Sequence, residues 1–144
     1  MAGKYYVLHT RATILQQKDS LDKAEKFYLQ ATDLHHRLLP KESAAEDLRE
    51  LPKIAYVQND FDKAKRYAAQ LLAEPNLKPH HKGSTLFRLN VIAFEEDDVA
   101  EFNHIYEEMK RLVQTDGIRI LNLYTEVNYH IINGEYKQAL RLAD

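Results

Sequence analysis

Seven histidines and one acidic run are the side chains of this sequence whose types could bind a metal ion. Two pairs of histidines are adjacent in the chain, and neighbouring side chains on a helix point about 100° apart, so that such a pair chelates poorly. The helical zinc pattern, two histidines four residues apart with a carboxylate base between them, does not occur. We therefore predict no metal site, and surface positions for the paired histidines, His35, His36, His80 and His81.

The acidic run Glu95-Glu96-Asp97-Asp98 has the charge of a calcium site but not its pattern. A calcium-binding loop needs spaced oxygen ligands, a central glycine and a distal bidentate glutamate, which this segment lacks. We predict instead a solvated turn in which Asp98 caps the N-terminus of the following helix.

Motifs for covalent or phosphate chemistry are missing as well. The sequence contains no glycine-rich phosphate loop, no Gly-x-Ser-x-Gly turn and no cysteine. We therefore expect no catalytic residues and no cofactor, and we predict that the chain is not an enzyme. An all-helical enzyme stays as an alternative, which a buried pair of titratable side chains in a closed pocket would favour.

Charge and hydropathy exclude two classes of partner. A net charge of −2 and a pI near 6.4 argue against nucleic-acid binding, which normally requires a basic excess. No apolar run approaches the roughly 20 residues that span a bilayer, and no signal peptide opens the sequence. We predict a protein outside the membrane. The lack of cysteine fits the cytoplasm, which we favour, or the periplasm.

The elements that must position these side chains are predicted to be helices. Four glycines and four prolines among 144 residues are too few for the turns of a β-sandwich. Long stretches instead carry apolar residues three and four positions apart, the helical period. We predict helix pairs over 4–18 and 21–39, 42–58 and 61–73, 83–95 and 98–113, and 118–133 with a partner from Glu135. Pro52 predicts a kink or interruption near Leu51-Pro52.

Four short segments of the chain resemble one another. Each has two small or polar residues, an apolar residue, two further residues and then the first buried position of a new helix. Their last residues, at 24, 64, 102 and 139, are 40, 38 and 37 positions apart. We interpret each as a tight turn between antiparallel helices, with Gly134 in the left-handed conformation at the last one. Phe102 replaces a small residue, which predicts a splayed third pair. The segments are 19–24, 59–64, 97–102 and 134–139.

These turns resemble those of the tetratricopeptide repeat. The small–aromatic–small pattern of that family is present as Ala24, Tyr28 and Ala31, and Asn59-Asp60-Phe61 with Ala64 is similar to its turn. The resemblance implies an all-α fold, a right-handed superhelical stack of antiparallel helix pairs (an α-solenoid) of about three and a half repeats. It implies a single domain over 1–144, with repeats at about 4–40, 42–74, 83–113 and an incomplete 118–144.

The resemblance also implies a concave groove lined by the first helix of each pair. Helical spacing selects the inward residues, in which aromatic side chains alternate with basic and polar ones, as a peptide-binding groove requires. The alternative is that the aromatic members form the core between repeats. The predicted groove residues are Tyr6, His9, Thr13, Arg49, Lys53, Tyr56, Phe87, Arg88, Tyr124 and Asn128, with Gln17, Ser84, Val91 and Ile131 beside them.

Together these features predict a protein- or peptide-binding module, the scaffold or sensing arm of a larger regulatory protein of bacterial type. We expect the chain to be a segment of a longer array, because Leu140 and Ala143 would leave the last repeat half covered. The alternative is a structural domain that forms homo-oligomers through this exposed terminal repeat.

Overall fold

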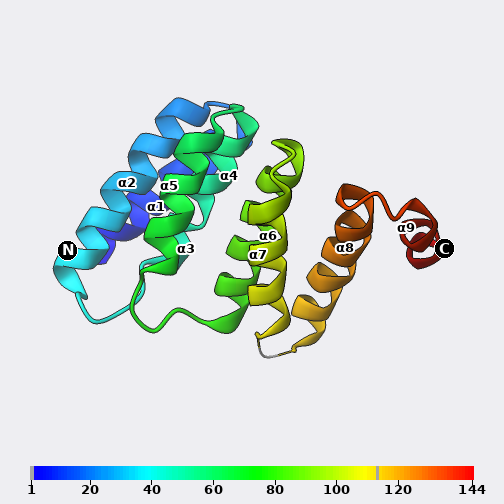
Figure 1. The fold of residues 1–144 in the computed structure, drawn as a ribbon. Coiled ribbons are helices and arrows are strands. Elements are labelled where there is room, and N and C mark those ends of the chain that lie inside the picture. The colour runs from blue at the N-terminus through cyan, green and yellow to red at the C-terminus, as the bar shows by residue number, and fades with distance from the viewer. Residues whose placement is uncertain (1, 113) are drawn as a thin grey trace. The chain divides into compact units, whose positions relative to one another are not determined.

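The computed structural model describes residues 2–112 and 114–144, and within these residues the secondary structure is helical, without a strand (Figure 1). The all-α prediction is therefore confirmed. The helices are α1 (Ala2–Gln17), α2 (Leu21–Leu38), α3 (Ala45–Leu48), α4 (Glu50–Val57), α5 (Phe61–Leu72), α6 (Pro79–Glu95), α7 (Val99–Lys110), α8 (Asp116–Ile132) and α9 (Tyr136–Ala143).

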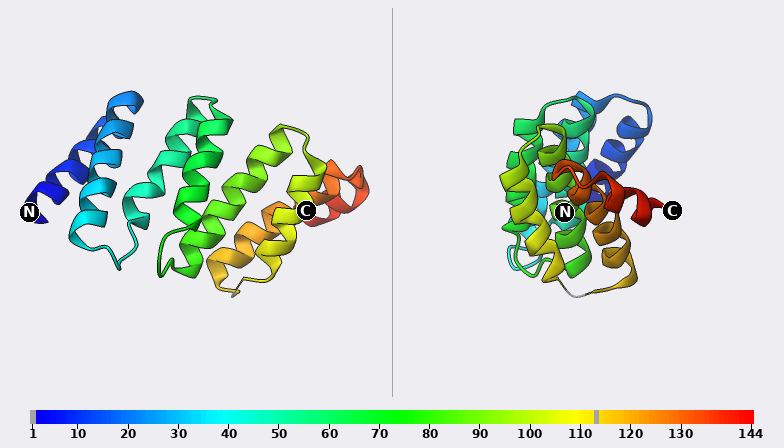
Figure 2. Two further views of the ribbon diagram at one scale, coloured as in Figure 1. Left: turned by 60° about the vertical axis from the view of Figure 1, so that its left-hand side comes forward. Right: turned by 45° about the vertical axis from the view of Figure 1, so that its right-hand side comes forward.

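The chain divides into two compact units, unit 1 up to Leu77 and unit 2 from Lys78. In unit 1, α1 pairs with α2 and α4 pairs with α5, and α2 also contacts α3 and α4. In unit 2, α6 pairs with α7 and α8 pairs with α9, and α8 contacts both helices of the preceding pair. Each pair is a helical hairpin, as Figure 2 shows. The superhelical stack of all the hairpins stays a prediction.

The four predicted turns share one backbone geometry. Asp19, Asn59, Asp97 and Gly134 have φ angles of 59°, 60°, 56° and 77°, all in the left-handed region. At the first turn, the amide of Ser20 donates to the carbonyl of Leu15 and that of Asp19 donates to Gln16, which is the Schellman pattern. The same two bonds recur at the other three turns. The repeat found in the sequence is therefore a repeated helix stop, including the left-handed Gly134.

Side-chain caps distinguish the two middle turns. Asp60 accepts from the amide of Lys63, and Asp98 accepts from the amide of Glu101, both at 3.0 Å. The predicted cap at Asp98 is confirmed. Ser20 and Glu135 occupy the same position without a side-chain cap. An aspartate there satisfies one of the free N–H groups of the first helical turn, which lowers the cost of starting the helix.

The prolines mark where the predicted helix boundaries were right and wrong. The expected interruption occurs at Arg49, between α3 and α4, so that Pro52 is the third residue of α4. A proline in the first turn removes an N–H that has no helical partner, and the helix therefore starts just before it. Pro79 was expected in a loop before a helix at 83. It instead begins α6, since its fixed φ suits the first helical position.

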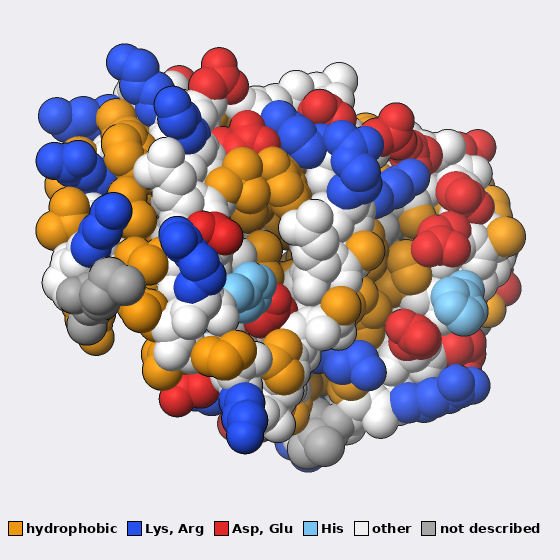
Figure 3. All heavy atoms as spheres, turned by 90° about the vertical axis from the view of Figure 1, so that its left-hand side faces the viewer, with side chains coloured by type: hydrophobic (Ala, Val, Ile, Leu, Met, Phe, Trp, Pro, Cys, Tyr) orange, Lys and Arg blue, Asp and Glu red, His pale blue; other side chains and the backbone are white. Residues whose placement is uncertain are grey.

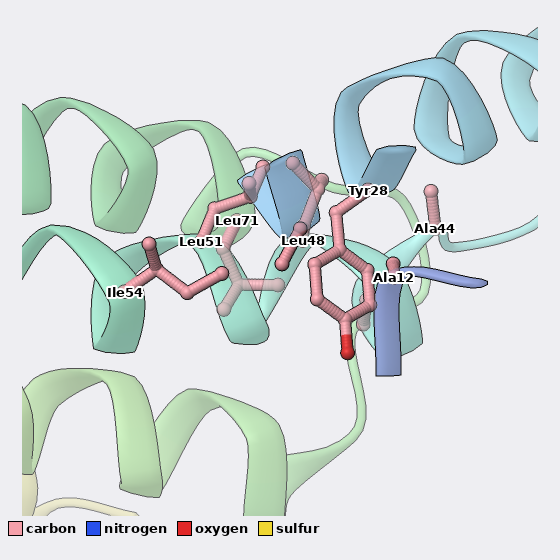
Figure 4. Close-up of a cluster of buried hydrophobic side chains, with 9 residues drawn as sticks. Ala12, Tyr28, Ala44, Leu48, Leu51, Ile54 and Leu71 are labelled. Carbon is pink, nitrogen blue, oxygen red and sulfur yellow. The ribbon is translucent and has the colours of Figure 1, made fainter. Parts of the chain in front are cut away.

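Unit 1 has a core of small and branched side chains, drawn in Figure 4. Ala12 and Ala24 are fully buried, which allows α1 and α2 to approach closely. Tyr28 lies between α1 and α3, and Leu48, Leu51 and Ile54 fill the space on the side of α5. Ala64 repeats the small residue of Ala24 in the second hairpin and is also fully buried.

Unit 2 has a larger side chain at one of its two equivalent places, where Phe102 replaces the small residue, whereas Ala139 keeps a small residue at the other. Phe102 is fully buried and packs against Phe94, Ala93 and Tyr106. Asn90 on α6 donates to the backbone carbonyl of Phe102 at 2.9 Å and so links the two helices of that hairpin. The splayed pair expected from Phe102 stays a prediction. Within the described residues, none of the helices combines the length and apolar character that crossing a bilayer requires.

Candidate functional site

A hollow of about 370 Å³ lies in unit 1 between the first hairpin and the start of the second. It contains three residues predicted for the groove, His9, Thr13 and Arg49, and Gln17 beside them. Its other residues were not predicted. The full lining is His9, Thr13, Gln16, Gln17, Tyr28, Glu46, Arg49 and Glu50. Side chains from α1, α2, α3 and α4 therefore converge on one site.

His9 is held at the hollow by a buried carboxylate. Its Nδ1 lies 2.7 Å from Oδ1 of Asp47, whose side chain is 0% exposed against 36% for His9. A buried carboxylate is stable only with partners, so this contact fixes the orientation of the imidazole. Nε2 is left as the hydrogen-bonding atom available to a ligand. The other oxygen of Asp47, Oδ2, is buried without a partner among the described residues.

Tyr5 shows the electrostatic effect of this pair. Burial raises the pKa of its phenol, and the nearby Asp47 carboxylate raises it further because the phenolate would be repelled. The ring also lies edge-on to His35, with centroids 5.6 Å apart. Tyr5 thus stays neutral beside Asp47 across the physiological pH range.

A chain of hydrogen bonds lines the wall of the hollow. Tyr28 donates its hydroxyl proton to Oε1 of Gln16 at 2.8 Å, and Thr13 donates to the carbonyl of His9 at 3.1 Å. Gln16 then donates to Oε2 of Glu50 at 3.1 Å. Burial raises the pKa of Tyr28, although the 3.3 Å contact between its hydroxyl and that of Thr13 acts in the opposite direction. This network connects α1 to α2 and α4.

Ion pairs order the rim of the hollow. Lys53 lies 2.8 Å from Oε1 of Glu50, and Arg49 lies 3.3 Å from Glu46 and 3.4 Å from Glu50. Burial disfavours the charged form of Glu50. The hydrogen bonds from Lys53 and Gln16 and the charge of Arg49 outweigh burial and lower its pKa. Lys53, a predicted groove residue, therefore supports the site through Glu50 without lining the hollow.

Two other predicted residues of unit 1 lie outside the hollow. Tyr6 is 67% exposed and packs edge-on against Tyr5. Tyr56 stacks on Phe61 with centroids 5.7 Å apart, so it supports the turn between α4 and α5. This stack lies within one hairpin, so the choice between a groove position for Tyr56 and a place in the core between repeats stays a prediction.

The remaining predicted residues belong to unit 2. Phe87 and Arg88 lie on α6 and are half-buried, as is Asn128 on α8, while Tyr124 is 62% exposed. α6 and α8 contact each other, so these four residues are carried by adjoining helices. A single groove that joins them to the residues of unit 1 stays a prediction.

The predictions for the paired histidines need one correction. His81 was expected at the surface but is 4% exposed, because it lies four residues before Thr85 on the buried stripe of α6. His36 is exposed, as expected, and bonds Glu74 at 2.7 Å. His35 is half-buried against Tyr5. Among the residues that the structure describes, no three His, Cys, Asp or Glu side chains form a group that could hold a metal ion.

Sequence reasoning missed Asp47, Gln16, Tyr28, Glu46 and Glu50 as parts of the site. One signal for Asp47 was present. Asp47 is four residues before Leu51 and seven before Ile54, so it belongs to the apolar stripe of the predicted helix 42–58, which the structure divides into α3 and α4. A carboxylate in such a stripe predicts a buried polar contact, and His9 supplies it. Tyr28 was predicted only as the aromatic residue of the repeat pattern, although its hydroxyl reaches Gln16.

The geometry of the Asp47–His9 pair bears on whether the hollow could serve as a nucleophilic active site. The Asp47–His9 pair positions an imidazole as a base would require. The adjacent hydroxyl of Thr13 donates to the carbonyl of His9 and not to its ring. The described residues therefore place no nucleophile against Nε2.

The surface drawn in Figure 3 mixes basic, acidic and hydrophobic side chains. Recognition of a partner would accordingly depend on a local constellation such as this hollow. Comparison of the chain with known protein families, curated proteins and solved structures finds no match.

Proposed function

We propose that this chain is a protein- or peptide-binding module and that the hollow of unit 1 contacts the ligand. The observation that carries the proposal is the convergence of His9, Thr13 and Arg49, three residues predicted for a binding groove, on one hollow. They come from separate segments of the chain, and the buried contact between His9 and Asp47 holds the site in place. The proposal includes no enzymatic activity and no cofactor.

The site has the properties that peptide recognition requires. Arg49 is 44% exposed and His9 is 36% exposed, so both are accessible to a ligand. Their positions are fixed by contacts to Asp47, Glu46 and Glu50. Preorganised polar groups on rigid helices lose little conformational entropy on binding, which improves affinity.

The architecture of the turns supports the tetratricopeptide-like part of the proposal. The four Schellman turns and the buried small residues after three of them are what a helical-hairpin repeat requires. By resemblance to that family, we infer a superhelical stack and a role as the scaffold or sensing arm of a larger regulatory protein of bacterial type.

A peptide array followed by charge reversals tests the proposal. Arg49→Glu and Lys53→Glu should each change binding of the captured peptides, because each reverses a charge at the hollow or its rim, and Arg88→Glu tests whether unit 2 contributes. Arg66→Glu is the matched control, since Arg66 is an exposed arginine on α5 that does not line the hollow. Unchanged binding in both Arg49→Glu and Lys53→Glu would contradict the proposed site.

A second candidate function is self-assembly through the last hairpin. Tyr136 and Leu140 on α9 are 64% and 66% exposed, and Ile120, Leu123 and Tyr124 on α8 are also exposed. Large exposed apolar side chains on two paired helices favour a protein interface where they form one patch. Sedimentation at several concentrations separates the two functions: association that Leu140→Glu abolishes would favour the second, and a monomer at high concentration would exclude it.

A further inference from the structure

The hydroxyl protons within the hollow of unit 1 are already committed to internal acceptors. The proton of Tyr28 is donated to Gln16, and that of Thr13 is donated to the carbonyl of His9. The two hydroxyl oxygens lie 3.3 Å apart, a hydrogen bond in which either can be the donor. In each arrangement both protons stay with residues of the protein, and the Thr13 oxygen keeps a lone pair that can accept. A ligand group that enters there therefore finds acceptors in the hydroxyls, not donors.

His9 adds a further acceptor. Because Nδ1 is directed at the Asp47 carboxylate, the neutral imidazole carries its proton on Nδ1 and presents the lone pair of Nε2. The described residues place no partner on Nε2, and His9 lines the hollow. The imidazole and the hydroxyls thus offer the same kind of hydrogen bond to a ligand.

The net charge of the site also favours a ligand that donates hydrogen bonds and carries a positive charge. Glu46, Asp47 and Glu50 supply three carboxylates, and Arg49 and Lys53 supply two cations, so the sum is −1 with His9 neutral. The guanidinium of Arg49 is shared between Glu46 and Glu50. A ligand carboxylate would compete with both of them for Arg49, whereas an ammonium group would find an excess of acceptors.

We infer that the hollow of unit 1 binds a basic side chain, the ammonium of a lysine above all, from a partner peptide. The inference rests on the proposed peptide-binding function and names the ligand chemistry of that site. The lysine ammonium carries three donors and no acceptor, which complements Nε2 of His9, the Thr13 hydroxyl and the carboxylates of Glu46 and Glu50.

An NMR titration of the full chain with short peptides tests this inference. The probes are a capped pentapeptide with one central lysine and its two counterparts with norleucine or glutamate at the centre. The lysine peptide should shift the backbone amides of Thr13, Gln16 and Arg49. The norleucine peptide should bind at least about tenfold more weakly than the lysine peptide, since it lacks the charge-assisted hydrogen bonds.

A matched pair of protein variants complements the probes. Glu50→Gln should weaken lysine binding, and Glu25→Gln should leave it unchanged. The two glutamates have nearly equal exposure, 13% and 14%, but Glu25 lies outside the hollow, where it bonds Tyr67 and Lys63. If Glu50→Gln does not fold, the lysine and norleucine peptides still test the inference on the unaltered chain.

Three results of the titration would overturn the inference. The first is equal binding of the lysine and norleucine peptides, and the second is tighter binding of the glutamate peptide. The third is a lysine-dependent shift centred on Thr32 and Gln70, which line a separate hollow of about 400 Å³ between α2 and α5. Array peptides that require Arg49 but contain no basic residue would refute the lysine inference and leave the proposed function intact. An array without any bound peptide would refute the proposed function itself.

Discussion

Asp47 and His9 link α3 to α1 through one short contact, 2.7 Å between Oδ1 and Nδ1, with the aspartate fully buried and the histidine at the edge of the hollow. The two residues are 38 positions apart and belong to successive hairpins. This contact gives the polar site of unit 1 its fixed geometry. It also makes stability depend on a residue that a ligand can reach.

His9→Ala should therefore destabilise unit 1 although the side chain is part-exposed. The substitution leaves the Asp47 carboxylate buried without its partner, which costs about 1–3 kcal/mol. Asp47→Asn should cost less, since a neutral amide is easier to bury. Urea unfolding measures both, with His104→Ala, an exposed histidine on α7, as the control. A loss in His9→Ala no larger than in the control would contradict the proposed role of the pair.

Two glycine-to-alanine substitutions should have opposite effects. Gly134→Ala places a β-carbon at φ +77°, which costs about 1–2 kcal/mol although no atom lies within 4 Å of it. Gly117→Ala is the same change in the first turn of α8, with equally open space and no left-handed backbone. It should stabilise by up to about 1 kcal/mol, because alanine favours the helix. Thermal unfolding of the two variants measures both effects. A change of the melting temperature in the same direction for both variants would contradict the prediction.

The stability of unit 1 should decrease in acid through Glu50. Its pKa is lower in the folded chain than the ordinary 4.5, so its charged form stabilises the fold above that pH. This contribution is lost as the pH falls through the lowered value, where the folded state takes up the proton. Urea unfolding between pH 3 and 7 measures the effect. Glu50→Gln should be less stable than the parent chain at pH 7, and this difference in stability should become smaller towards pH 3. A difference in stability that does not change with pH would exclude Glu50 as the source of the pH dependence.

Phe102→Ala should be strongly destabilising, even though it restores the small residue found at the equivalent place in the other three turns. Phe102 is fully buried against Phe94 and Tyr106, and its removal leaves a cavity that costs about 3–5 kcal/mol. Tyr124→Ala, a change at a 62% exposed aromatic residue of the same unit, is the control. Denaturant unfolding measures the loss of stability in both variants. Similar losses of stability would contradict the prediction and would mean that unit 2 repacks around alanine.

The sequence alone determined the features whose causes lie within a few neighbouring residues. The four tight turns and the left-handed Gly134 could be predicted, since backbone preference and the next helix start are local. The left-handed φ angles of Asp19, Asn59 and Asp97 were found only in the structure. The aspartate cap at Asp98 and the break before Pro52 are equally local effects. Buried positions such as Ala24 and Ala64 followed from helical periodicity, which fixes the inward face of each helix.

Tertiary structure decided which polar side chains meet. His9 and Thr13 could be placed on one face of a helix, but their neighbours Asp47 and Glu50 depend on how the second hairpin lies against the first. The burial of His81 depends in the same way on the packing of α6. Periodicity says where a side chain points along its own helix. Only the packing of the helices says which side chain of another segment it meets, because that contact depends on distance in space and not on spacing in the chain.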